Sequence, residues 1–109
     1  MRKTILLIVD DWEVLERIED SLAPHFDLLS APFGKEGLEV AQEKVPHHIV
    51  LDLTFENMTN DEALLALKSS AATASIPVTV LRRDSSQEGV SIGKLVEGLR
   101  LAYEIAESN

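Results

Sequence analysis

The segment ILLIVDD at residues 5–11 gives the strongest indication of the fold of this chain. Its first five residues are apolar and rich in Ile and Val, a run typical of a strand buried on both faces of a parallel sheet. Asp10 and Asp11 end the run, and apolar residues then recur at helical spacing until Pro24 ends the pattern. A buried strand that leads directly into a helix predicts an α/β protein.

Strand and helix patterns alternate along the rest of the chain. The later strands are predicted at residues 27–31, 49–52 and 78–81, and the later helices from Gly34 to Pro46, after Asn60, and from Ser91 to about Glu107. After Leu81 the alternation stops, and residues 82–89 are polar and turn-like. This order predicts an α/β fold with a mainly parallel sheet and a C-terminal helix.

Composition and charge limit the possible classes of function. The 109 residues are 45% apolar and 27% charged, so residues 1–109 are predicted to form one globular domain with no output domain. The chain has no cysteine, which leaves no disulfide or thiolate site, and its apolar runs are too short to span a membrane. We therefore expect a cytoplasmic protein. Its formal charge of −9 disfavours direct contact with nucleic acid and favours divalent cations and basic partner surfaces.

Three acidic residues follow the predicted strands. Asp10 and Asp11 close the first strand, and Asp52 closes the third. The carboxyl ends of parallel strands share one edge, where open α/β sheets bind ligands. If the first and third strands are neighbours, the carboxylates converge, and a hard cation such as Mg²⁺ relieves their repulsion. The alternative stays open that Asp11 is a helix N-cap and Asp52 a loop residue.

The chain resembles the receiver domains of bacterial response regulators. The resemblance rests on residues 5–11, on IVLDL at 49–53 with Met58 six residues after the Asp, on IPVTVL at 76–81, and on the stretch 31–40. It covers nearly the whole chain, and the double acid with the strand-end Asp is its most specific part. It implies a flavodoxin-like doubly wound sheet of four strands in the order 2-1-3-4.

The resemblance also implies a chemistry for the acidic residues. Asp52 would accept a phosphoryl group from a histidine kinase or phosphotransfer protein. Asp10, Asp11 and Asp52 would hold Mg²⁺, with a backbone carbonyl of Leu53 or Thr54 as a further ligand. The chain would then act as a signalling domain rather than as an enzyme, and its output would pass through contact with an unknown protein target.

Several positions depart from the family pattern. Arg82 stands where the family has a Ser or Thr, and Glu56 stands where it has a Pro four residues after the phosphorylated Asp. After Leu81 the one lysine is Lys94, inside the last helix, so the family's strand-end lysine is missing. The fourth helix and fifth strand of the family look deleted. Arg82 could replace the lysine as a forked partner for carboxylate or phosphate, or could be a solvated loop charge.

The departures keep other functions open. One is a pseudo-receiver, a protein-interaction module on the same fold that does not respond to phosphorylation. Another is a small metal-dependent phosphatase, which we discount because the sequence offers no separate general acid–base residue.

The deletion also predicts a homodimer. Without a fifth strand, residues 78–81 would lie at the edge of the sheet, and an apolar edge strand is a template for association. Leu101 and Ile105 lie on a flank of the last helix, where they could extend an interface. The opposing interpretation is that the last helix and residues 82–89 cover the edge.

Three histidines fall in predicted connecting segments. They are His25, His47 and His48. The adjacent pair could bind a metal ion, but neighbouring residues rarely present both rings to one ion. We therefore expect all three histidines to be solvated.

Overall fold

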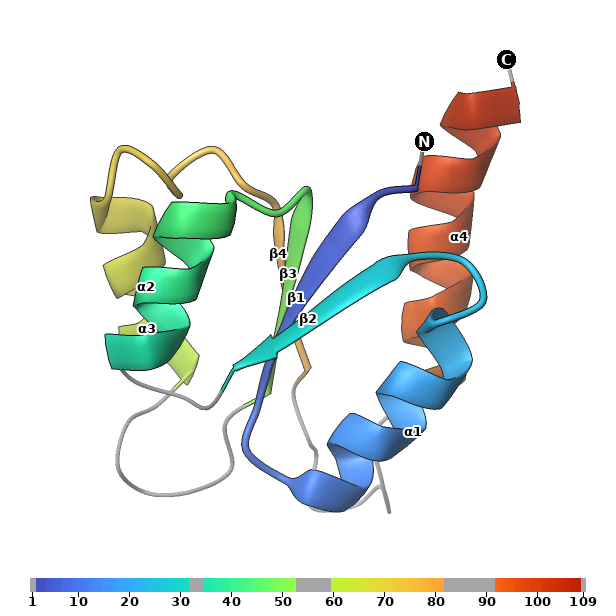
Figure 1. Ribbon diagram of the computed structural model, residues 1–109, viewed down its shortest axis with the longest axis horizontal. Coiled ribbons are helices and arrows are strands. Elements are labelled where there is room, and N and C mark those ends of the chain that lie inside the picture. Colours follow the sequence, from blue (N-terminus) through green and yellow to red (C-terminus); the bar gives the residue numbers. More distant parts are fainter. Residues whose placement is uncertain (1, 32–34, 53–59, 82–91, 109) are drawn as a thin grey trace.

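The computed structural model describes residues 2–31, 35–52, 60–81 and 92–108 (Figure 1). Its elements in chain order are β1 (Thr4–Val9), α1 (Trp12–Leu22), β2 (Asp27–Ala31), α2 (Lys35–Lys44), β3 (His48–Asp52), α3 (Asn60–Ser69), β4 (Val78–Val80) and α4 (Ile92–Ser108). The predicted alternation of strand and helix is therefore confirmed. The boundaries differ in detail, because β1 and β3 each begin one residue before the apolar run that identified them.

The four described strands form one parallel sheet in the order β2-β1-β3-β4. This is the predicted flavodoxin-like order. The strand β1 lies between β2 and β3, which explains why the whole stretch from Ile5 to Val9 is buried. The register pairs Ile5 with His48 at one end of β3 and Val9 with Asp52 at the other.

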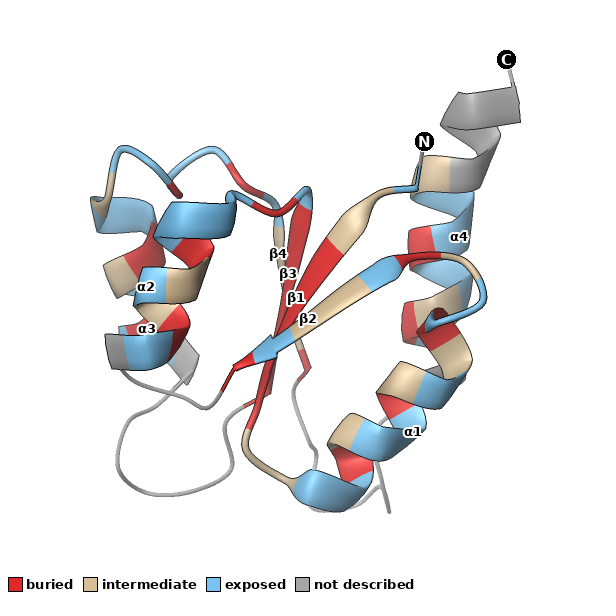
Figure 2. Cartoon of the chain, viewed as in Figure 1, coloured by how far each residue is buried: buried red, intermediate tan, exposed pale blue. Residues whose placement is uncertain are grey.

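The helices α1 and α4 lie on one face of the sheet, and α2 and α3 lie on the other (Figure 1). Side chains alternate between the faces of a strand, so β1 contributes to two cores. Ile5, Leu7 and Val9 pack in the core beneath α1 and α4, which we call the α1/α4 core. Leu6 and Ile8 pack in the core beneath α2 and α3. Figure 2 shows the buried residues concentrated along β1 and β3 and on the helix faces turned toward them.

The connection from α3 to β4 is held by side chains that contact its backbone. Lys68 donates hydrogen bonds from Nζ to the carbonyl oxygens of Ala74 (3.2 Å) and Ile76 (2.9 Å). The buried Thr73 hydroxyl donates to the carbonyl oxygen of Leu67. The Thr73 contact satisfies a carbonyl group near the end of α3. The Lys68 contacts satisfy carbonyl groups of the connection and hold it in place before β4.

Some predictions fall on residues that the structure does not describe. The turn-like segment 82–89, with Arg82, lies outside the described residues, as do Gly34, Leu53, Thr54 and Glu56. The family comparison that suggested a deleted helix and strand concerns the same region. Among the described helices, none is both long enough and apolar enough to cross a membrane.

Candidate functional site

The acidic residues from the first and third strands meet at one edge of the sheet. Asp52 is the last residue of β3 and pairs with Val9, the last residue of β1. The backbone N–H of Asp10 donates a hydrogen bond to the backbone carbonyl of Asp52 at 3.2 Å. Pairing β1 directly with β3 therefore places Asp10 beside Asp52, as the sequence predicted for neighbouring strands.

The side chain of Asp52 is almost completely buried. Only 1% of its surface is exposed. Because side chains alternate along a strand, Asp52 lies on the same face of β3 as Val50, which belongs to the α1/α4 core. A buried carboxylate is costly unless polar groups compensate it, and no buried side-chain nitrogen or oxygen in the described part of the chain lacks a hydrogen-bond partner. The position therefore holds a polar group inside the fold rather than at a solvated loop.

Asp11 has a defined role at the start of α1. Its backbone is extended, and its Oδ1 accepts hydrogen bonds from the backbone N–H groups of Glu13 (3.0 Å) and Val14 (3.3 Å). This is the N-cap arrangement, which satisfies donors that the first helical turn cannot pair internally. Of the two roles that the sequence left open for Asp11, the capping role is present in the structure, and the metal-binding role remains a prediction.

The donor atoms at this edge suit a hard cation. Asp10 and Asp52 provide carboxylates, and Mg²⁺ commonly takes one or two carboxylates together with waters and phosphate oxygens. Within residues 2–31, 35–52, 60–81 and 92–108, no three His, Cys, Asp or Glu side chains are grouped as a metal site. The chemistry of the donors thus fits Mg²⁺ with ligands beyond the protein. The predicted Thr54 carbonyl and Arg82 both lie outside the described residues.

A polar cluster that the sequence analysis missed lies at the end of the sheet where the strands begin, opposite to the acidic residues. His48 is only 9% exposed, so the prediction that it is solvated was wrong. Its Nδ1 lies 2.8 Å from the hydroxyl of Tyr103 on α4, and its Nε2 lies 2.7 Å from the hydroxyl of Thr79 on β4. Burial lowers the pKa of His48 and raises the pKa of Tyr103. The sequence did contain a signal for this burial, because side chains alternate along a strand and residue 48 therefore shares a face with residues 50 and 52.

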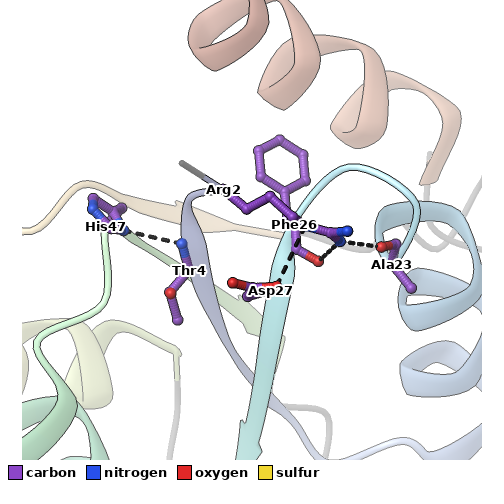
Figure 3. Close-up of polar contacts among 6 residues, drawn as sticks. All are labelled: Arg2, Thr4, Ala23, Phe26, Asp27 and His47. Atoms are coloured by element: carbon purple, nitrogen blue, oxygen red, sulfur yellow. Dashed lines mark hydrogen bonds and ion pairs between the residues drawn. The ribbon is translucent and has the colours of Figure 1, made fainter. Parts of the chain in front are cut away.

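Two neighbouring contacts at that end tie the start of β1 to the rest of the fold (Figure 3). His47 remains exposed, and its Nδ1 accepts a hydrogen bond from the backbone N–H of Thr4 at 3.0 Å. The Arg2 guanidinium donates to the backbone carbonyls of Ala23 and Phe26, and its Nε lies 3.3 Å from a carboxylate oxygen of Asp27. These contacts are far along the strands from the acidic edge and organise the turn between α1 and β2.

Among known sequences, one curated protein matches most of this chain over a small part of its own length. No family model matches the chain. A protein named as a histidine kinase from Formosa agariphila is 33% identical over 85 residues, which make up 77% of this chain. The same match spans only 6% of that protein's length. The likeness therefore concerns one small segment of a much larger protein.

Solved structures with a similar fold include several response regulators. A protein described as a response regulator from Chloroflexus aurantiacus has a TM-score of 0.78 at 18% identity, covering 92% of this chain and 96% of its own. The N-terminal domain of a receiver protein from Methanoculleus marisnigri has a TM-score of 0.69 at 22% identity, covering 93% and 96%. A phosphorylated cyanobacterial phytochrome response regulator has a TM-score of 0.66 at 19% identity, covering 93% of each chain.

Proposed function

We propose that this chain, which has the fold of response-regulator receiver domains, accepts a phosphoryl group on Asp52 from a histidine kinase or phosphotransfer protein. The observation that carries the proposal is the pairing of β1 with β3, which brings Asp10 to the backbone of Asp52 at the carboxyl edge of the sheet. The segment shared with a protein named as a histidine kinase supports a place in two-component signalling.

The proposed reaction is a phosphoryl transfer between two side chains. A carboxylate oxygen of Asp52 forms a bond to phosphorus while the N–P bond of the donor phosphohistidine breaks. The bonding electrons stay on the imidazole nitrogen, which takes up a proton, and Asp52 becomes an acyl phosphate. Asp10, Asp11 and Asp52, with the Thr54 carbonyl, would hold Mg²⁺. The ion would supply positive charge beside the phosphoryl oxygens.

The switch that follows phosphorylation is proposed to be altered. At Arg82 the chain has a guanidinium where the family has a hydroxyl, and a guanidinium binds carboxylate or phosphate through two parallel hydrogen bonds. We assign Arg82 a partner role toward Asp52 or its phosphoryl group. The expected consequence is a smaller difference between the two states than in receivers with the hydroxyl.

The same proposal covers partners and location. The formal charge of −9 argues against nucleic acid as a direct partner, so the output would pass through contact with a protein target. The chain would work in the cytoplasm as a signalling domain rather than as an enzyme. We also propose that it forms a homodimer.

The proposal is tested by incubating the purified chain with acetyl phosphate and Mg²⁺ and measuring its intact mass. One added phosphoryl group is expected on the natural chain and none on Asp52→Asn, which keeps the size of the side chain. Asp10→Asn should slow the addition without unfolding the protein. If no phosphoryl group is added, even with a histidine kinase domain as donor, the proposal fails.

A phosphorylation-independent interaction module is the second candidate. The burial of Asp52 favours it, because an attacking carboxylate needs access to its donor and only 1% of this side chain is exposed. The mass measurement separates the two functions. The interaction module gives no adduct under any donor and keeps its protein contacts in Asp52→Asn.

A further inference from the structure

The cluster around His48 connects three elements through one imidazole ring. His48 begins β3, Thr79 lies in β4 and Tyr103 lies in α4, and both ring nitrogens of His48 are within 2.8 Å of a hydroxyl oxygen. The Tyr103 ring meets His48 edge-on, with centroids 5.8 Å apart, and meets Phe26 edge-on at 6.0 Å. The cluster therefore fastens α4 to the sheet at the edge away from the acidic residues.

The contacts of His48 suit a neutral ring. The Tyr103 hydroxyl lies 2.8 Å from Nδ1 and 3.4 Å from the carbonyl oxygen of His47, and the Thr79 hydroxyl lies 2.7 Å from Nε2. A neutral imidazole has one donor and one acceptor, and either tautomer satisfies both contacts because a hydroxyl can donate or accept a hydrogen bond. Protonation would place a positive charge in a buried position.

The surroundings offer little compensation for such a charge. The partners of the ring are hydroxyls rather than carboxylates. Among the described ionisable groups on the surrounding elements, Tyr103 lies on α4 and His47 directly precedes β3. Asp27 at the start of β2 is paired with Arg2 at 3.3 Å, and Arg100 on α4 is exposed. Among the side chains that the structure describes on these elements, a protonated His48 would therefore meet neutral or basic groups, apart from Asp27, which already has a cation.

We propose that His48 is a pH-sensitive latch that holds α4 on β3 and β4, and that protonation of its ring releases the Tyr103 end of the helix. The released helix would solvate the imidazolium and expose the part of the α1/α4 core that Leu99 and Tyr103 cover. The same core lines the strand face that ends at Asp52, so acid pH would loosen the layer over the proposed phosphorylation site. The latch itself does not depend on that site.

The direction of the pH effect follows from linkage. Burial lowers the pKa of His48 below its usual value of 6.5, so the undocked or unfolded chain binds more protons than the folded chain. The stability contributed by the latch is complete above the usual value. It is lost as the pH falls from there through the lower pKa of the folded state.

The first test is a titration of the full chain followed by NMR of the histidine ring protons. His48 should titrate below its usual pKa of 6.5. Because the test uses the natural chain, it does not depend on a variant that folds. A pKa of His48 at or above its usual value would overturn the proposal.

The second test is hydrogen exchange of α4 amides at about pH 7.5 and about pH 5, expressed as protection factors that correct for intrinsic exchange. Protection in α4 should fall at acid pH by up to about tenfold for each unit between the two pKa values of His48. His48→Gln should abolish this dependence, and the matched control His47→Gln should keep it. Equal loss of protection in all helices, or an unchanged pH dependence in His48→Gln, would contradict the latch.

Discussion

Single residues at the acidic edge of the sheet serve the fold as well as the proposed chemistry. Asp11 caps α1 through two backbone N–H groups, and Asp52 ends β3 in a buried position. Sequence reasoning located both residues because acids directly follow two apolar runs, Asp10 and Asp11 after the first and Asp52 after the second. It could not decide between capping and metal binding for Asp11, since the same carboxylate at the same place suits both roles.

The two roles of Asp11 can be separated by two substitutions. Asp11→Ala should lower the free energy of unfolding by about 1 kcal/mol, because the cap is lost. Asp11→Asn should stay close to the natural chain in stability, because Asn caps helices about as well as Asp. Urea unfolding provides the measurement.

The same pair of variants tests the metal site. Both should weaken the response of Trp12 fluorescence to Mg²⁺, since Trp12 follows Asp11 directly and is 69% exposed. If Asp11→Asn responds to Mg²⁺ like the natural chain, Asp11 is a cap and not a ligand.

His48 shows where residue patterns fail. It follows Pro46 and His47, which resemble a connecting segment, and its weak sequence signal of burial is that it shares a strand face with residues 50 and 52. Its partners Thr79 and Tyr103 are 31 and 55 residues away along the chain. Only the tertiary arrangement of β3, β4 and α4 brings the three side chains together.

Among the elements, the buried strands were the most predictable. Continuous Ile, Leu and Val runs identified β1 and β3, and the acids after them identified the candidate site. The connection from α3 to β4 was not predictable in the same way. It depends on Lys68 and Thr73 contacting backbone carbonyls, which leaves no periodic pattern in the sequence.

The prediction of a homodimer rests on the position of β4 in the sheet. In the described sheet it is the last strand, it is three residues long, and its side chains are half-buried. Leu101 on α4 is 53% exposed. We expect sedimentation across a concentration series to show a dimer, because an apolar edge strand can pair with a second copy and closed two-fold assemblies are common.

A double substitution tests where the copies would meet. Val80→Lys together with Leu101→Glu should shift the dimer toward monomer by placing charges at the edge strand and on α4. Leu65→Glu is a suitable control, since Leu65 is also largely exposed but lies on α3 on the other face of the sheet. A monomer at every concentration, or a dimer that the double substitution leaves unchanged, would contradict the prediction.

At the scale of the whole molecule, the order of strands joins the fold to the proposed function. Asp10 and Asp52 come from segments about forty residues apart, and they meet because β1 pairs with β3. The alternation of elements predicted a mainly parallel α/β sheet, the resemblance to receivers predicted its strand order, and the solved structures with a similar fold agree with both. The positions of Thr54 and Arg82 remain predictions, since both fall outside the described residues.

Asp52 is the residue proposed to carry the phosphoryl group. Borohydride reduction of the phosphorylated chain converts an aspartyl phosphate into homoserine, and peptide mass spectrometry then identifies the position. Homoserine is expected at residue 52 when donor and Mg²⁺ are present, and at no position when either is omitted. Homoserine at Asp10 or Asp11 instead, or none at any position in a chain shown to be folded, would contradict it.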